Sequence, residues 1–352
     1  MFVTKVEAFK VKVPFLKNVI SPALNADLYP HYVWETPIVR VHTDEGITGI
    51  GESTVQSGAD QVVGAVQACA GELVGKDPLE FNLQRLPFSG SVAQPLEHAL
   101  YDIAGKALGQ PVCRLLGGRY RSRVPIAYWS TVIPVEATVK EARRAAELGF
   151  KVHKLKARPW NIVEIAERVM KEVGSGLQIR VDPNTLFNDP ATAAKLAQRL
   201  EPYSVECFED PVPKENMDWY RLLRLKTSIP QGLHLGRPED LLRAVKAEAV
   251  DCVNLSGLAG SVLASAAIAD AAGVKVWTQV AGLGLGVSEA FAVHVAAALR
   301  NEPMPCDELH FLREDDLIAE PLEVKDGYIE VPSKPGLGVE LDEKALAKFK
   351  VD

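Results

Sequence analysis

The sequence has little cysteine and none of the patterns in which cysteine shapes a fold. Five cysteines are scattered through 352 residues, without a C-x-x-C pair or an even-numbered framework. Such spacing argues against a disulfide scaffold. It predicts reduced thiols, several of them filling the core of a cytoplasmic protein.

Long hydrophobic runs are missing as well. The first six residues, Met-Phe-Val-Thr-Lys-Val, lack the apolar stretch of a signal peptide. The most apolar late stretch, Val262 to Val276, contains Ser, Asp and Lys and is too short and too polar to cross a bilayer. We therefore expect a soluble protein that does not enter a membrane.

There is no excess of positive charge. A net charge of −7 and a pI near 5.6 argue against nucleic acid or an anionic membrane as a partner, since both require a basic face. An anionic small substrate stays open, because local lysines and a metal can reverse the field inside a pocket. No G-x-G-x-x-G motif opens a helix after a strand and no Walker motif occurs, which disfavours nucleotide binding.

The periodicity of apolar residues changes along the chain. The first fifty residues alternate apolar and polar residues as strands do, and residues 95–109 repeat apolar residues at helical spacing. After residue 120, helical and strand-like segments alternate, which predicts a parallel sheet. Their number favours a (β/α) barrel, with an open doubly wound sheet as the alternative. We predict an α+β capping domain (1–120), a modified TIM-like (β/α) barrel (121–317) and a segment returning to the cap (318–352).

Polar residues close the successive predicted strands of the barrel. Each interval between them, about 21 to 27 residues, is the length of one βα unit. The carboxyl ends of barrel strands form one rim, so these side chains should converge on a single cavity. The residues are Lys156, Asp182, Glu209, His234 or Leu235, Ser256 and Gln279.

Two lysines on one predicted strand are candidates for a catalytic base. Lys154 and Lys156 alternate along the strand and so point to the same side. Adjacent ammonium groups disfavour each other's charge, and partial burial lowers the pKa further. A lysine tuned in this way can act as a general base near pH 7. The alternative is a solvated basic strand end.

Asp182 and Glu209 each end an apolar strand. A carboxylate in that place is costly unless it is paired or bound to a metal. Oxygen ligands of this type suit Mg²⁺, or another divalent cation such as Mn²⁺. The metal would hold a substrate carboxylate and stabilise the enediolate that forms when the α-proton leaves. Plain salt bridges to the two lysines are the other interpretation.

Several longer motifs accompany these residues. They are Thr43-Asp44-Glu45-Gly46, Gly49-Ile50-Gly51-Glu52, the run Asp102 to Pro111, Leu115-Leu116-Gly117-Gly118, Lys154-Leu155-Lys156, Asp182-Pro183-Asn184, Phe208-Glu209-Asp210-Pro211 and Pro335-Gly336-Leu337-Gly338-Val339. Together they resemble the enolase superfamily, in its mandelate racemase / muconate lactonizing enzyme family, over nearly the whole chain.

The resemblance implies a capping domain over a modified barrel, Mg²⁺ on three acidic ligands, Lys156 as the base and Lys154 assisting. Loops around residues 18–31 and 53–59 would line the substrate pocket. Relatives of this kind are commonly dimers or octamers, so a homo-oligomer is expected. Our candidates for contacting the substrate are Asn184, Ser256 and Gln279.

The chain also departs from the family pattern. The third acidic ligand usually follows an Ile-Pro strand, but here that position falls on Leu235, and His234 is the nearest substitute. A role beside the metal or on the substrate is the alternative for His234. Ser256 stands where relatives carry a lysine or an aspartate, and Gln279 stands near the position of a histidine. The pocket therefore lacks an obvious acid or base on the face opposite Lys156.

A base on one face favours a lyase or isomerase. We expect metal-dependent abstraction of the proton next to the carboxylate of a small hydroxy or sugar acid, leading to dehydration or cycloisomerisation, with epimerisation as a further outcome. A Schiff-base aldolase using Lys156 is one alternative, and the metal-ligand spacing counts against it. A catalytically degenerate binding homologue is another, and the retention of both lysines counts against that.

Overall fold

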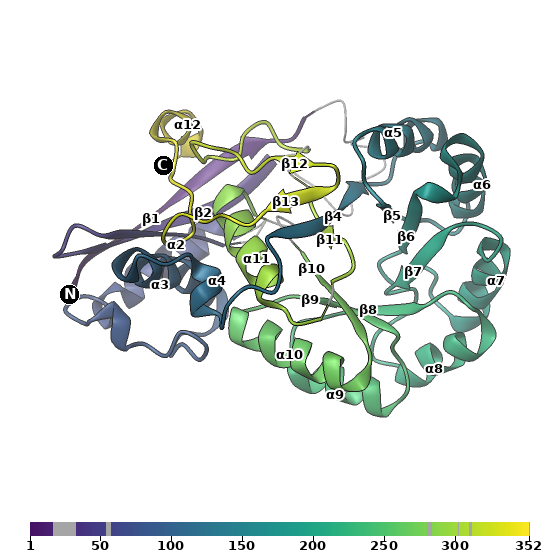
Figure 1. Ribbon diagram of the computed structural model, residues 1–352, viewed down its shortest axis with the longest axis horizontal. Coiled ribbons are helices and arrows are strands. Elements are labelled where there is room, and N and C mark those ends of the chain that lie inside the picture. The colour runs from purple at the N-terminus through teal and green to yellow at the C-terminus, as the bar shows by residue number, and fades with distance from the viewer. Residues whose placement is uncertain (17–32, 54–57, 280–283, 302, 310–311, 352) are drawn as a thin grey trace.

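The computed structural model describes residues 1–16, 33–53, 58–279, 284–301, 303–309 and 312–351. These residues form two lobes, a small sheet with helices beside a larger barrel, and both chain ends lie at the small lobe (Figure 1). In the part of the chain described, no helix combines the length and the apolar character that crossing a bilayer requires.

The small lobe contains four strands: β1 (Val3–Pro14), β2 (Val33–Thr43), β3 (Thr48–Glu52) and β14 (Lys350–Val351). They form an antiparallel sheet in the order β14-β1-β2-β3. Gly46 lies in the turn between β2 and β3 with φ of 78°, a conformation that glycine adopts without strain.

Helix α3 (Ala93–Leu108) lies very close to this sheet. A Cβ added at Gly49 would stand 2.1 Å from the carbonyl oxygen of Ala99, and one at Gly51 would stand 1.9 Å from that of Pro95. Strand β3 therefore needs glycine at both positions. The other helices here are α2 (Ala59–Cys69) and α4 (Val112–Leu115), with 3₁₀ turns at Ala70–Glu72, Pro78–Glu80 and Gly90–Val92.

Eight parallel strands close the large lobe into a barrel. Neighbouring strands pair in chain order, β11 pairs with β4, and a bridge from Gln279 to Asp307 joins the last two strands. The closure rules out the open-sheet alternative. The strands are β4 (Arg123–Ser130), β5 (Val152–Lys156), β6 (Gln178–Asp182), β7 (Val205–Glu209), β8 (Gln231–Leu235), β9 (Cys252–Leu255), β10 (Lys275–Thr278) and β11 (Cys306–Asp307).

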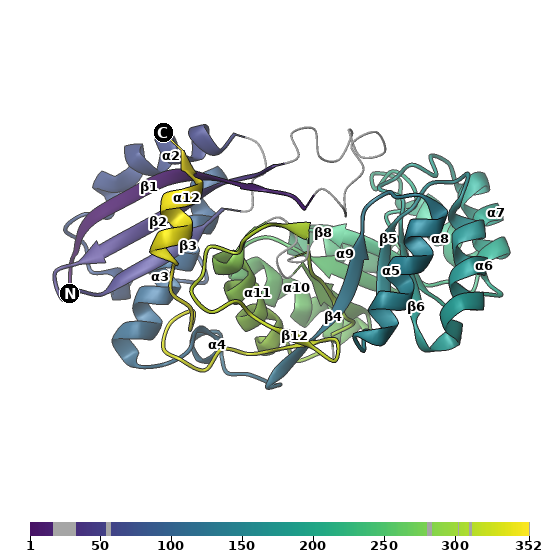
Figure 2. The same ribbon diagram turned by 90° about the horizontal axis from the view of Figure 1, so that it is seen from above.

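Helices cover the outside of the barrel (Figure 2). The start of one of them shows how local sequence sets a boundary: Asp189 Oδ1 accepts hydrogen bonds from the backbone N–H of Ala191 and Thr192, both at 2.9 Å, and Pro190 takes the first helical position. The helices are α5 (Val135–Glu147), α6 (Ile162–Val173), α7 (Pro190–Leu200), α8 (Met217–Lys226), α9 (Pro238–Lys246), α10 (Ala259–Ala272) and α11 (Gly286–Ala298), with a 3₁₀ turn at Gly174–Gly176.

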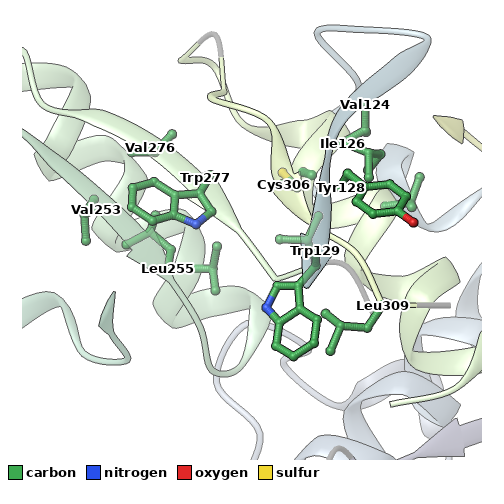
Figure 3. Close-up of a cluster of buried hydrophobic side chains, with 14 of the residues drawn as sticks. Val124, Ile126, Tyr128, Trp129, Val253, Leu255, Val276, Trp277, Cys306 and Leu309 are labelled. Carbon is green, nitrogen blue, oxygen red and sulfur yellow. The ribbon is translucent and has the colours of Figure 1, made fainter. Parts of the chain in front are cut away.

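The apolar core extends into the barrel. Figure 3 shows Trp129 of β4 and Trp277 of β10 among aliphatic side chains of β4, β9 and β10. Both indoles are buried, with exposed fractions of 3% and 0%. The charged residues that lie against Trp277 are therefore next to a buried apolar layer, in which a charge needs a partner.

The last residues contact both lobes. Helix α12 (Glu343–Phe349) and β14 lie against β1, as expected for a tail that returns to the cap. In contrast, β13 (Tyr328–Glu330) pairs with β12 (Val324–Lys325) and with the first half of β4. The limits 1–120, 121–317 and 318–352 remain a proposal.

Candidate active site

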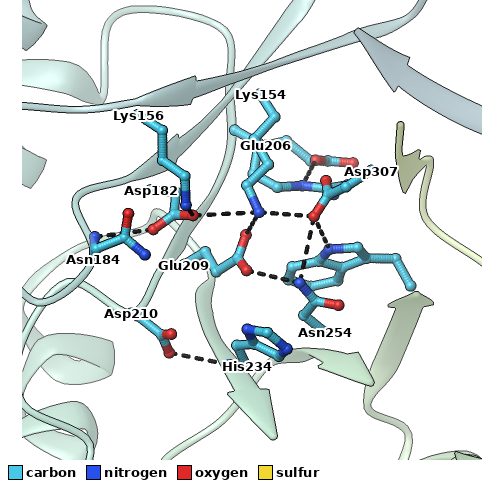
Figure 4. Close-up of polar contacts among 12 residues, drawn as sticks. Lys154, Lys156, Asp182, Asn184, Glu206, Glu209, Asp210, His234, Asn254 and Asp307 are labelled. Carbon is cyan, nitrogen blue, oxygen red and sulfur yellow. Dashed lines mark hydrogen bonds and ion pairs between the residues drawn. The ribbon is translucent and has the colours of Figure 1, made fainter. Parts of the chain in front are cut away.

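Three of the predicted residues end consecutive barrel strands. Lys156, Asp182 and Glu209 are the last residues of β5, β6 and β7. Lys156 is directly paired with Asp182 in the parallel ladder. Because parallel strands end at one rim, the three side chains converge at the mouth of the barrel, as Figure 4 shows.

Lys154 lies at the centre of a buried charge cluster. Its Nζ is 2.6 Å from Glu209 Oε2, 2.7 Å from Asp307 Oδ2 and 3.3 Å from Asp182 Oδ2. Burial opposes the charge, yet these carboxylates, Asp307 foremost, raise the pKa of Lys154 well above its ordinary value. The lowered pKa predicted for the lysine pair is therefore wrong for Lys154, because three carboxylates outweigh burial and the nearby Arg180.

Lys156 is the accessible lysine of the pair. Its side chain is 12% exposed, against 1% for Lys154, and its Nζ donates a hydrogen bond to Asp182 Oδ2 at 2.5 Å. Burial by itself would raise the pKa of Asp182, but Lys156 and Lys154 lower it below its ordinary range. The other oxygen of Asp182 accepts from the backbone N–H of Asn184 at 2.9 Å. Lys156 can thus reach a molecule in the mouth with little rearrangement.

Glu209 is held from a second side by Asn254. The Nδ2 of Asn254 donates to Glu209 Oε1 at 2.8 Å, whereas Oε2 has its ion pair with Lys154 but no hydrogen bond of regular geometry. Burial raises the pKa of Glu209 to about 7, with Lys154 opposing the shift and Asp182 adding to it. This carboxylate is therefore under-satisfied at one oxygen.

Strand β8 brings His234 rather than Leu235 into the interior. Leu235 is part of the hydrophobic core, while His234 pairs with Asn254 in the ladder and lies next to it in Figure 4. The position that corresponds to the family's third ligand, Leu235, thus packs in the core, and its substitute His234 takes the inner face, because side chains alternate along a strand. Its backbone N–H donates to Asp210 Oδ1 at 3.0 Å, and its ring Nε2 is buried without a hydrogen-bond partner. Burial lowers the pKa of His234 to about 4, so the ring is neutral.

The other predicted residues lie at the edge of this cluster. Ser256 follows β9, and its N–H donates to the carbonyl of Leu235 at 3.2 Å. Gln279 follows β10 and bridges to Asp307. The substrate-binding role of Ser256, Gln279 and Asn184 stays a prediction. The expected pocket loop at 18–31, and residues 54–57 of the loop expected at 53–59, lie outside the described residues.

Sequence reasoning missed Asp307. Its Oδ2 lies 2.7 Å from Lys154 Nζ and accepts from Trp277 Nε1 at 3.3 Å, and its Oδ1 accepts from Arg180 at 2.9 Å. Strand β11 has two residues and therefore no periodicity to recognise. The one available signal is the interval: Asp307 comes 28 residues after Gln279, close to the length of one more βα unit.

The donor set at the mouth can be compared with what a divalent cation requires. Asp182 and Glu209 supply carboxylate oxygens, and the unpartnered Nε2 of His234 supplies a nitrogen, which is suitable chemistry for such an ion. In the present arrangement, the described residues include no three His, Cys, Asp or Glu side chains assembled as a metal centre. A bound cation would therefore compete with Lys154 for Glu209.

Two family models match the chain. Residues 33–117 match the N-terminal domain of mandelate racemase / muconate lactonizing enzyme, and residues 137–345 match the enolase C-terminal domain-like model. The chain belongs to the mandelate racemase / muconate lactonizing enzyme family. The resemblance noted in the sequence and the fold of cap plus TIM-like barrel are confirmed.

Individual relatives cover most of this family member. A D-galactonate dehydratase family member of Paenibacillus sp. (strain JDR-2) is 30% identical over 87% of this chain and 87% of its own length. A chloromuconate cycloisomerase of Cupriavidus pinatubonensis is 31% identical over 89% of this chain and 90% of its own. The structure of a muconate lactonizing enzyme from Pseudomonas fluorescens, complexed with muconolactone, superposes with a TM-score of 0.86 at 25% identity, covering 99% of each chain.

These relatives are lyases and isomerases, which confirms the predicted enzyme class for the family. Enzymes of this family depend on a divalent metal ion and act on small carboxylates.

Proposed function

We propose that this protein abstracts the proton next to the carboxylate of a small hydroxy or sugar acid and completes a dehydration or a cycloisomerisation. The observation that carries the proposal is the division of the lysine pair: Lys156 is accessible at the mouth, whereas Lys154 is enclosed by carboxylates. The dehydratases and cycloisomerases among the relatives support the reaction class. Epimerisation is the third outcome of the same first step.

Lys156 is the proposed base. Its Nζ is 2.5 Å from Asp182, so the carboxylate orients this general base. Lys154 contributes a fixed positive charge beside the place where negative charge develops on the substrate. Asn184, Ser256 and Gln279 are the proposed contacts that orient the substrate at the rim.

Mg²⁺ is the proposed cofactor, with Mn²⁺ as the alternative, and Asp182, Glu209 and His234 are the residues that would hold it. When bound, the cation would neutralise the substrate carboxylate and the charge that builds up as the proton leaves. The cytoplasmic location and the homo-oligomer, a dimer or an octamer, also remain predictions from the sequence.

A second candidate, a catalytically degenerate binding homologue, is favoured by one observation. The interior position of the sixth barrel strand holds Asn254, which donates to Glu209 and is neither a strong acid nor a strong base. Asn254 of the sixth strand therefore cannot act as a strong acid or base across from Lys156. The same fact is compatible with a reaction in which Lys156 acts alone.

Proton–deuterium exchange measured by NMR decides between the two. The protein with Mg²⁺ is incubated in D₂O with a library of hydroxy, sugar and amino acids, beside Lys156→Ala. Lys151→Ala, which removes an exposed lysine just before β5, is the matched control. Exchange that is lost in Lys156→Ala and on chelation, and kept in Lys151→Ala, supports the enzyme. Silence across the library with no metal found by elemental analysis supports the binding homologue.

A further inference from the structure

The carboxylate of Asp307 is shared by two buried cations. Its Oδ2 lies 2.7 Å from Lys154 Nζ, and its Oδ1 accepts a hydrogen bond from Arg180 Nη1 at 2.9 Å. Trp277 Nε1 donates to Oδ2 as well, at 3.3 Å. All four side chains are at most 1% exposed, so solvent does not screen these charges. Removing one partner would leave a buried charge without its counter-charge.

The three carboxylates around Lys154 differ in their other partners. Asp182 also binds Lys156 at 2.5 Å, and both Asp182 and Glu209 are the proposed carboxylate ligands of the cation. The other partners of Asp307 are hydrogen-bond donors that cannot bind a cation: Arg180, Trp277 and, at 3.4 Å, the Nδ2 of Asn254 that also donates to Glu209. Of the three, Asp307 is thus the one that keeps its hold on Lys154 when Asp182 and Glu209 engage a cation or a substrate.

The position of Asp307 is fixed both by the pairing of its backbone and by the side chain of Arg180. In the ladder Asp307 pairs with Ala127 of β4, and it bridges to Gln279 after β10, so its position follows from closure of the barrel. The guanidinium of Arg180 lies 4.2 Å from the centre of a Trp277 ring and donates through Nε to Glu206 at 2.8 Å. Asp307 therefore cannot follow Lys154 toward the mouth.

We propose that Asp307 is a positioning residue for the lysine pair. It holds the side chain of Lys154 in the barrel interior, so that Lys156 alone is free to move a proton at the mouth. Without the Asp307 charge, the remaining carboxylates around Lys154 would be Glu209 at 2.6 Å and Asp182 at 3.3 Å, which both end their strands at the mouth. Lys154 would then be drawn toward the mouth and would compete with Lys156 for Asp182. The inference rests on the proposed role of Lys156 as the base.

Two variants that each remove one carboxylate charge from Arg180 test the proposal. Asp307→Asn removes the partner that Arg180 shares with Lys154, whereas Glu206→Gln removes a partner that belongs to Arg180 and not to Lys154. Glu206 lines a depression at the amino-terminal end of the barrel, away from the mouth. A change in labelling or in kcat that is caused by removing a counter-charge from Arg180 should appear in both variants. A change that is caused by releasing Lys154 should appear only in Asp307→Asn.

The first readout needs no substrate. Native protein with Mg²⁺ is treated with ¹³C-formaldehyde and a borane reductant, and methylation of Lys154 is followed by peptide mass spectrometry. We expect methylation at least about tenfold faster in Asp307→Asn than in wild type, with Glu206→Gln unchanged, because an amine reacts only when it leaves its buried ion pairs. Equal labelling in all three proteins would overturn the proposal.

The second readout is the kinetics of a compound that undergoes exchange. We expect kcat to fall by at least about tenfold in Asp307→Asn while KM stays within about twofold, since the base is misplaced but the rim is intact. If Asp307→Asn does not fold, Asp307→Ser removes the same charge with a small polar side chain. Faster Lys154 labelling in Asp307→Ser supports the proposal, and wild-type labelling refutes it. Absence of exchange in wild type refutes the proposed function and leaves the labelling result valid.

Discussion

Both carboxylate oxygens of Glu97 in the small lobe accept the backbone N–H of Ala259 at the start of α10, at 3.0 and 3.2 Å. Glu52, at the end of β3, accepts in the same way from Leu285 and Ser288 at the start of α11. Two buried carboxyl groups of the cap thus accept hydrogen bonds from the amino-terminal ends of two barrel helices, whose first N–H groups have no partner within the helix. The lobes are joined by these contacts.

The first prediction concerns the pH dependence of stability. Burial raises the pKa of Glu97 to about 8 and that of Glu52 to about 7, from 4.5 when exposed. The folded protein then binds protons that the unfolded chain releases, so this stability is complete below about pH 4.5 and is lost as the pH rises through 7 and 8. We expect a lower melting temperature at pH 8.5 than at pH 6.

Glu97→Gln should flatten this decline, because the amide cannot ionise, and should exceed wild type in melting temperature at pH 8.5. Circular dichroism melts over the pH series measure it. Glu239→Gln, on the exposed face of α9, is the control and should follow the wild-type curve. A Glu97→Gln curve parallel to wild type would show that Glu97 is already ionised in the folded state.

The second prediction concerns the buried lysine. Lys154→Met should lower the free energy of unfolding by about 3–5 kcal/mol, because it leaves Asp182, Glu209 and Asp307 facing one another without their shared counter-charge. Urea unfolding measures the change. Lys5→Met removes an ion pair to Glu7 at the surface and should have little effect. Equal losses in the two variants would contradict the central role of Lys154.

The third prediction concerns the metal. His234→Asp supplies a third carboxylate on the inner face of β8, and Mg²⁺ prefers oxygen to imidazole nitrogen. We expect Mg²⁺ to bind at least about tenfold more tightly than to wild type, about 1.4 kcal/mol, by isothermal titration calorimetry. His234→Asn has a similar size without the charge and should not gain affinity. An unchanged Mg²⁺ affinity in His234→Asp would show that residue 234 does not contact the metal.

The fourth prediction concerns the packing of the cap. Gly51→Ala places a methyl group against the carbonyl of Pro95 and should cost about 1–3 kcal/mol or more, since backbone atoms cannot move aside. Gly64→Ala, in α2 with open space around it, should stabilise by about 0.5–1 kcal/mol through helix propensity. Chemical denaturation compares the two. If Gly51→Ala leaves the free energy of unfolding unchanged, α3 must be able to move away from β3.

Much of the site could be predicted from the sequence because its residues end regular strands. Lys156, Asp182 and Glu209 close apolar segments at intervals of one βα unit, and parallel strands must bring such residues to one rim. The amphipathic helices likewise have boundaries that local chemistry sets, as at Asp189 and Pro190. These features depend on short-range pattern, which a single sequence contains.

Tertiary structure alone decided which of the two lysines is accessible at the mouth and which groups surround each of them. Asp307 lies 153 residues from Lys154 and on a two-residue strand, so no local pattern links them. Whether His234 or Leu235 points into the barrel depends on which face of β8 turns inward, and the register with β9 sets that face. The state of Lys154 then follows from three carboxylates gathered by closure of the barrel. Sequence determined the strands and the residue types, and long-range packing determined the charge that each buried group experiences.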